Sequence, residues 1–201
     1  MDTTSGAAPL FTLRRRCAYT SAVSDTSAHP FGFDAHDHCY RMVGVDLTAI
    51  DGVGANTVLT VLSETGTEMS AWRSERAFGS WLGLAPNPRK SGGRVMYSAT
   101  KPNAQRAATA FRLAARSLSN SKSALGAFYR RLRARIGAPK AITATAYKIA
   151  KLFYQMLKTK RPYQDVGQAA YDERFRARRL RSLKRMASEL GFDLVPAHSG
   201  T

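Results

Sequence analysis

One long stretch of this chain contains many basic residues and no acidic ones. Between Glu75 and Asp165 there is no aspartate or glutamate, whereas the same stretch contains nineteen lysines and arginines. A basic surface without carboxylates is typical of a protein that binds a polyanion, because Lys and Arg contact phosphates and carboxylates repel them. The same composition excludes a divalent-metal site built from paired carboxylates of this stretch alone. If the stretch performs covalent chemistry, we expect a hydroxyl group to perform it.

The composition of the whole chain narrows the class of protein. Its 201 residues are enough for a domain with a hydrophobic core, and a hydrophobic fraction of 44% is ordinary for a globular protein. The net charge of +17 favours nucleic acid or an anionic membrane surface as the partner. No apolar run approaches the ~20 residues of a membrane span, and no secretory signal is visible. Cys17 and Cys39 make no disulfide framework, which favours a reduced cytosolic compartment.

The spacing of apolar residues predicts a mainly α-helical fold. We expect a compact helical domain with a helix-hairpin-helix-like element, a basic C-terminal helix and a disordered N-terminal leader. The leader is expected at residues 1–30, the central domain at 31–164 and the basic helical tail at 165–201. Helices are expected at about residues 55–64, 78–84, 102–118, 125–136, 142–157 and 165–190. The segment 87–100 has the least regular pattern, with room for a short strand near 95–97.

A glycine-rich turn, Ile50 to Gly54, separates two of the apolar segments. Gly52 and Gly54 let backbone amides approach DNA phosphates, and the following helix presents the positive end of its dipole. Phosphate contact is therefore predicted at this turn, with an ordinary tight turn between helices as the alternative. The turn lacks the third spaced glycine and the preceding strand of a dinucleotide-binding fingerprint.

A second flexible segment places a serine directly before two glycines. Gly92 and Gly93 leave the backbone free to bring the Ser91 hydroxyl close to a phosphodiester. Lys90 and Arg94 flank it and are suited to neutralise the charge that develops on a pentacovalent phosphorus. Attack by Ser91 would link the protein to DNA through a phosphoserine and conserve the bond energy for rejoining. Judged by spacing alone, a plain loop is the commoner role for such a segment.

Other basic and polar residues extend this predicted surface. Ser98 or Thr100 is expected to cap a helix that begins near Pro102. The arginine-rich tail from Arg174 to Arg185 is either an exposed helical face or a contact for phosphate or RNA. Five further residues are predicted to contact DNA: Lys101, Asn103, Arg106, Arg130 and Arg131.

Two other groups of residues have plainer interpretations. His36, His38 and Cys39 lack a second pair at metal-ligand spacing, so a solvated loop is expected and no metal site is predicted. Trp72 and Trp81 are expected in the core rather than as platforms for stacked bases.

Several blocks together resemble one protein family in order and spacing. The family is the IS110 group of bacterial insertion-sequence transposases, and the similarity is to its C-terminal transposase domain over roughly residues 31–196. The blocks are Val45-Asp46-Leu47-Thr48-Ala49-Ile50-Asp51-Gly52-Val53-Gly54, Ser80-Trp81-Leu82-Gly83-Leu84-Ala85-Pro86, Ser91-Gly92-Gly93, Pro102-Asn103-Ala104-Gln105-Arg106-Ala107 and Ala124-Leu125-Gly126-Ala127-Phe128-Tyr129-Arg130-Arg131.

The resemblance implies a function in DNA transposition. Members of the family pair this domain with an N-terminal RuvC-like domain that bears four acidic metal ligands, and a structured RNA guides them. Ser91 corresponds to the family serine taken to be the nucleophile, and Lys90, Arg94, Lys101 and Arg106 match basic positions that hold phosphate. No cofactor is expected within this chain, since the divalent metal belongs to the RuvC-like domain. The bacterial cytoplasm, in association with the nucleoid, is the expected location.

The chain departs from the family in its acidic residues. Asp34, Asp37, Asp46 and Asp51 lie too close together, and in the wrong region, to replace the four acids of the RuvC-like domain. We therefore expect a truncated or rearranged transposase whose activity requires that domain, with DNA, a guide RNA, a second copy or an intact transposase as partner and no membrane. The alternative is a catalytically inactive, nucleic-acid-binding remnant. A basic protein that binds ribosomal RNA is a third idea, to which the blocks around Ser91 lend no support.

Overall fold

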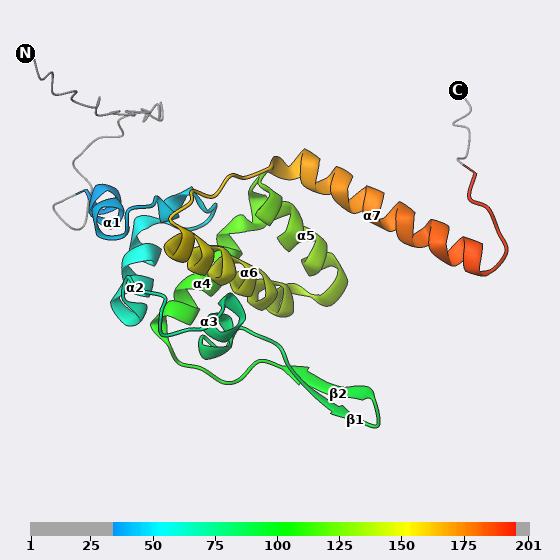
Figure 1. Cartoon of the computed structure of the whole chain (residues 1–201), viewed down its shortest axis with the longest axis horizontal. Helices are drawn as coiled ribbons and strands as arrows, with labels where there is room; N and C mark the ends of the chain where they lie inside the picture. The colour runs from blue at the N-terminus through cyan, green and yellow to red at the C-terminus, as the bar shows by residue number, and fades with distance from the viewer. Residues whose placement is uncertain (1–33, 196–201) are drawn as a thin grey trace, which may run out of the picture. The chain divides into compact units, whose positions relative to one another are not determined.

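The computed structural model describes residues 34–195, so the predicted leader at 1–30 lies outside the described residues. Within them, most residues form α-helices, which confirms the mainly α-helical prediction (Figure 1). The helices are α1 (Ala35–Val43), α2 (Ala55–Thr65), α3 (Glu75–Trp81), α4 (Arg106–Ser117), α5 (Ala124–Ile136), α6 (Ala138–Thr159) and α7 (Gly167–Glu189). Two short 3-10 turns, η2 (Leu47–Ala49) and η3 (Leu118–Asn120), and two strands, β1 (Asn87–Ser91) and β2 (Arg94–Ala99), complete the described elements.

Helix α6 lies at the centre of the core. It packs against α3, α4 and α5, and α4 also packs against α2. Phe153 of α6 and Phe111 of α4 are fully buried and meet edge to face, with ring centroids 5.4 Å apart. Such aromatic pairs stabilise a core beyond the area that they bury. The core therefore holds the helices on either side of the hairpin in fixed positions.

Helix α4 begins later than predicted. Its first residue is Arg106 rather than a residue near Pro102, so neither Ser98 nor Thr100 caps it. The side-chain oxygen of Asn103 instead accepts a hydrogen bond of 2.8 Å from the N–H of Gln105. This local turn keeps the residues before Arg106 outside the helix. The first helical N–H groups are then accepted by Glu64 of α2. This cap comes from a residue more than forty positions away in the sequence, so the local sequence does not predict it.

The segment predicted to be the least regular is an antiparallel β-hairpin. Ser91 of β1 is opposite Arg94 of β2, and Arg89 is opposite Tyr97. A register shift between Arg89 and Lys90 marks a β-bulge in the hairpin. The strand predicted near 95–97 is confirmed as part of β2, whereas the prediction of irregular structure for the rest was wrong. In Figure 1 the hairpin extends away from the helices, and its two strands pair with each other.

The histidines near the start of the described chain belong to a helix rather than to a solvated loop. Asp34 caps α1 by accepting the N–H groups of His36 and Asp37, and Cys39 of the same helix is buried. Among residues 34–195, no group of three or more His, Cys, Asp or Glu side chains is arranged to hold a metal ion. No helix in this part of the chain is long and apolar enough to cross a membrane.

Candidate nucleic-acid interface

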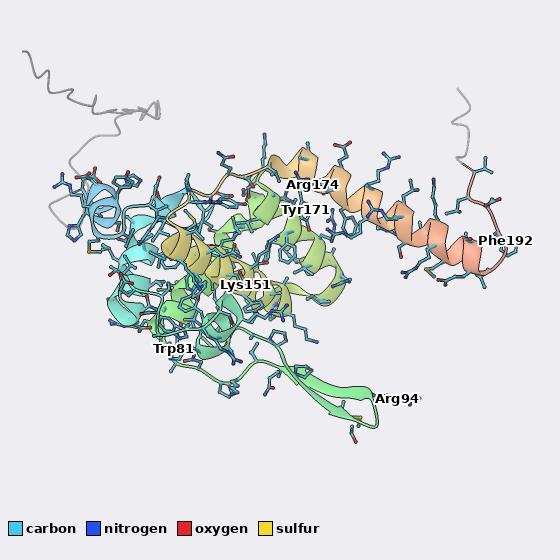
Figure 2. The ribbon with its side chains drawn as sticks, viewed as in Figure 1. Trp81, Arg94, Lys151, Tyr171, Arg174 and Phe192 are labelled. Atoms are coloured by element: carbon cyan, nitrogen blue, oxygen red, sulfur yellow. The ribbon has the colours of Figure 1, made fainter. Side chains whose placement is uncertain are left out.

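Ser91 lies at the tip of the hairpin. It is the last residue of β1, it is exposed, and its cross-strand partner is Arg94, which is also exposed (Figure 2). Gly92 and Gly93 form the turn with φ values of 54° and 76°. Positive φ at both central residues is what a type I′ two-residue hairpin turn requires, and glycine adopts it without strain. The glycines therefore have a structural reason to follow Ser91.

The tip is open to a bulky ligand. A Cβ atom added at Gly92 or Gly93 would meet nothing within 4 Å. Both strands and the turn contain only basic or uncharged residues, and Lys90 precedes Ser91 in β1. A phosphodiester can therefore approach the Ser91 hydroxyl without meeting a carboxylate of the hairpin itself.

The predicted contact residues at the start of α4 divide into two kinds. Lys101 is exposed, and Arg106 is exposed over 75% of its side chain although its Nε donates to Glu64 at 3.2 Å. Asn103 is used internally, since its Nδ2 donates to the carbonyl oxygen of Trp81 at 3.2 Å. Lys101 and Arg106 are thus available to phosphate, whereas Asn103 fixes the segment that leads from the hairpin to α4.

Arg130 and Arg131, both predicted to contact DNA, are used within the fold. Arg130 donates to the carbonyl oxygen of Ser121 at 2.6 Å and to the side-chain oxygen of Gln168 at 2.8 Å. The Arg131 guanidinium donates to Asp172 at 2.7 Å. Its carbon also lies 3.4 Å from the ring centroid of Phe175. Both arginines therefore join α5 to α7.

The glycine turn before α2 also has a structural explanation for one of its two glycines. A Cβ atom at Gly52 would lie 2.6 Å from the carbonyl oxygen of Ala114, so this glycine permits close contact with α4. Gly54 is different, because a Cβ atom there would meet nothing within 4 Å, and it precedes the free N–H groups of α2. Asp51 in the same turn adds a carboxylate that repels phosphate. The predicted phosphate contact of this turn remains a prediction, with Gly54 its more accessible member.

Sequence analysis missed a polar cluster behind that turn. The Ser121 hydroxyl donates to Asp51, and its oxygen is hydrogen-bonded to the hydroxyl of Ser123, which caps α5 by accepting the N–H of Gly126. Asp165 accepts the N–H of Ala124 and the hydroxyl of Tyr163. Burial, aided by the charge of Asp165, raises the pKa of Tyr163 to about 12. The cluster ties the turn, α5 and the start of α7 together, and its partners are too far apart in sequence for spacing to reveal them.

A cavity of about 490 Å³ lies at the base of the hairpin. Its walls include Leu84 and Pro86 before β1, Ile136 at the end of α5, and Tyr147 of α6. Lys140 is the single cation of the lining. Because the walls are mostly apolar, the cavity suits an apolar group rather than a phosphate. It is therefore not part of the candidate interface.

A comparison with known protein families finds a match that includes the hairpin. Residues 46–130 match the model of the transposase IS116/IS110/IS902 family. The matched segment, less than half of the chain, is similar to the transposase domain of that family. The matched range includes the glycine turn, the whole hairpin with Ser91, and the segment that leads into α4. No curated protein matches the chain with significant similarity. The similarity to this family therefore includes the residues of the candidate interface.

Proposed function

We propose that this transposase domain binds DNA and presents Ser91 as the nucleophile for strand exchange in DNA transposition. The observation that supports the proposal best is the position of Ser91, exposed at the tip of a hairpin that contains no carboxylate. Arg94 lies across the hairpin from Ser91, and Lys101 and Arg106 follow the hairpin in the chain. These three residues would provide cations for the phosphates of the bound strand. The reaction would take place at DNA in the bacterial cytoplasm.

The proposed step is a transesterification at phosphorus. The Ser91 oxygen attacks a DNA phosphodiester, a bond forms between that oxygen and phosphorus, and one bridging P–O bond to deoxyribose breaks. The serine loses its proton to a base, and the departing sugar oxygen gains one. The number of phosphoester bonds is unchanged, so a second sugar hydroxyl can reverse the step on another strand without an external energy source. Arg94 would stabilise the charge on the pentacovalent phosphorus.

We propose that the base comes from outside the hairpin. Residues 87–99 include no His, Asp or Glu, so the strands hold no carboxylate or imidazole to take the serine proton. We propose that a RuvC-like domain, with a guide RNA, completes the active site and would hold the divalent metal. The described residues of this chain contain no group of three or more His, Cys, Asp or Glu side chains that could hold such a metal.

A covalent-adduct assay tests the proposal. The full chain is incubated with a RuvC-like partner, guide RNA and labelled suicide DNA whose broken end cannot be rejoined, and adducts are separated under denaturing conditions. We expect a labelled adduct with the wild type and none with Ser91→Ala. Ser80→Ala, which alters an exposed serine of α3, is the matched control and should give the wild-type yield. An adduct that persists in Ser91→Ala would refute the assigned nucleophile.

The alternative is a nucleic-acid-binding remnant without chemistry. It is favoured by the lack of a carboxylate or imidazole base in the hairpin together with the net charge of +17. The remnant would bind DNA with an affinity that falls steeply with salt, as cation–phosphate contacts require. Salt-dependent binding without any adduct in the assay above would select this alternative.

A further inference from the structure

Helix α7 contains a line of arginines along one face. Arg174, Arg178, Arg181 and Arg185 recur at positions i, i+4, i+7 and i+11, and all four are exposed. Residues at this spacing lie one above another on an α-helix. Within residues 34–195, only Arg185 of the four forms an ion pair, a loose one with Glu189 at 3.6 Å. We call these four residues the arginine line.

The opposite face of the same helix contains two exposed leucines. Leu180, Leu183 and Ala187 recur at i, i+3 and i+7, about half a turn away from the arginine line. Leu180 is 52% exposed and Leu183 is 48% exposed, and no residue of α7 is buried. The helix thus contributes little to the core. Packing in the core therefore does not explain why its arginines are aligned on one face.

The start of α7 is fixed to α5, which sets the direction of the arginine line. Arg131 lies over the ring of Phe175, with its guanidinium carbon 4.8 Å from the ring centroid of Tyr171. The N–H of Gln168 donates to the carbonyl oxygen of Lys122 at 3.0 Å. These contacts hold the first two turns of α7, where Tyr171 and Arg174 lie (Figure 2). These contacts therefore hold the N-terminal end of the arginine line, at Arg174, next to α5.

The charge pattern disfavours the helix unless an anion is present. From residue 174 to residue 188 there are seven lysines and arginines and no acidic residue. Arg174 and Arg178, like Arg181 and Arg185, are like charges four residues apart, a spacing that destabilises a helix. A bound polyanion removes this repulsion.

The dimensions suit a nucleic-acid strand. The arginine line spans 11 helical steps, or about 16 Å at 1.5 Å per residue. One strand of B-DNA presents a phosphate about every 3.4 Å of axis, so roughly five phosphates lie along that span. Arginine also contacts phosphate with two donors at once.

We propose that the arginine line binds the sugar-phosphate backbone of a nucleic-acid duplex, as a contact separate from the Ser91 hairpin. A membrane surface fits less well, because Arg176 and Arg179 interrupt the apolar face that an interfacial helix would insert. The inference extends the DNA-binding part of the proposed function and does not depend on the chemistry of Ser91.

The test compares two variants that lose equal charge from the same turns of α7. Arg178→Gln with Arg181→Gln removes half of the arginine line, and Arg176→Gln with Arg179→Gln removes two cations from the other side. Affinity of the full chain is measured against salt concentration with random-sequence DNA and RNA duplexes of equal length. We expect the slope of log affinity against log salt to fall by about 2 in the first variant. The second should keep the wild-type slope.

Each outcome decides the inference. Equal losses in the two variants, or no loss in either, would show that position on the helix is irrelevant and would overturn it. Binding to anionic phosphatidylserine vesicles but to neither duplex would assign the helix to a membrane instead. The two duplexes distinguish a DNA contact from a contact with an RNA stem. Ser91→Ala should leave all of these slopes unchanged, so failure of the adduct assay does not affect this test.

Discussion

At the scale of single residues, Glu64 joins α2 to the start of α4. Its two carboxylate oxygens accept the N–H of Arg106 at 3.0 Å and the N–H of Ala107 at 2.9 Å. The Arg106 side chain adds a third bond. The hydrogen bond from Ala107, followed by those from Arg106, holds the pKa of Glu64 below its usual value. One acidic residue thus fixes the helix that follows the hairpin and caps its N-terminus.

We predict that Glu64→Ala lowers the free energy of unfolding by about 1–3 kcal/mol, because it leaves helix N–H groups without a charged acceptor. Glu64→Gln should cost less, since the amide oxygen still accepts one bond. Urea unfolding at neutral pH measures both. Glu68→Ala, an exposed glutamate nearby, is the control and should change stability by less than about 0.5 kcal/mol.

The same carboxylate predicts a pH dependence. The folded pKa of Glu64 is below its unfolded value of about 4.3, so its stabilising effect is fully present above that value. The effect is lost as the pH falls through the folded pKa. The stability difference between the wild type and Glu64→Gln should therefore shrink in acid. A difference that grew as the pH fell would contradict the assigned hydrogen bonds.

Single residues also show where sequence reasoning stops. Arg130 and Arg131 have the composition and helical position of surface cations, and both were predicted to contact DNA. Their partners, Gln168 and Asp172, lie about forty residues further along the chain. Spacing within one helix contains no information about such contacts. Ser91 and Arg94 are within four consecutive residues, so the sequence alone suggests them as candidates, and their role stays a prediction.

At the scale of elements, the helices were predictable and the hairpin was only partly so. The period of apolar residues indicated α2, α5, α6 and α7 to within a few residues. Strand β1 reads Asn-Pro-Arg-Lys-Ser, which lacks β-branched and aromatic residues and includes a proline. The available signal was Gly92-Gly93, a dipeptide typical of hairpin turns. Tight pairing with β2 overrides the low strand propensity of β1.

We predict that Gly92→Ala with Gly93→Ala disorders the hairpin without unfolding the domain. Each alanine at positive φ costs about 1–2 kcal/mol, and the cost stays local because the strands pair with each other. The urea midpoint should stay at the wild-type value, while amide hydrogen exchange in β1 and β2 becomes faster. A large fall in the midpoint would show that the hairpin is part of the cooperative unit.

Gly83→Ala is the matched comparison for that experiment. Gly83 also has positive φ, at 64°, but an added Cβ would lie 2.8 Å from the Cβ of Asn103 and 3.0 Å from the carbonyl oxygen of Lys101. This change should lower the midpoint itself, because Gly83 is buried between α3 and the segment before α4. The pair of results separates strain in an exposed turn from strain in the core.

At the scale of the whole described unit, three acidic residues form ion pairs that join one helix to another. Glu64 joins α2 to α4, Glu75 joins α3 to Lys151 of α6, and Asp172 joins α7 to α5. Most cations have no such partner among the described residues. Three acids of the described residues are thus used in contacts between elements, and the excess of cations leaves a positive surface, which is the condition for electrostatic attraction of a polyanion.

The attachment of α7 gives the last prediction. We expect Phe175→Ala to release α7 from α5, because it removes the ring beneath the Arg131 guanidinium while no residue of α7 is buried. Trypsin should then cut within residues 174–185 sooner than in the wild type, while the urea midpoint of the remaining helices changes by little. Leu183→Ala, which alters an exposed leucine on the same helix, should leave the cleavage rate unchanged. If Phe175→Ala instead unfolded the whole domain, α7 would be part of the core, and the arginine line could not be an independently attached surface.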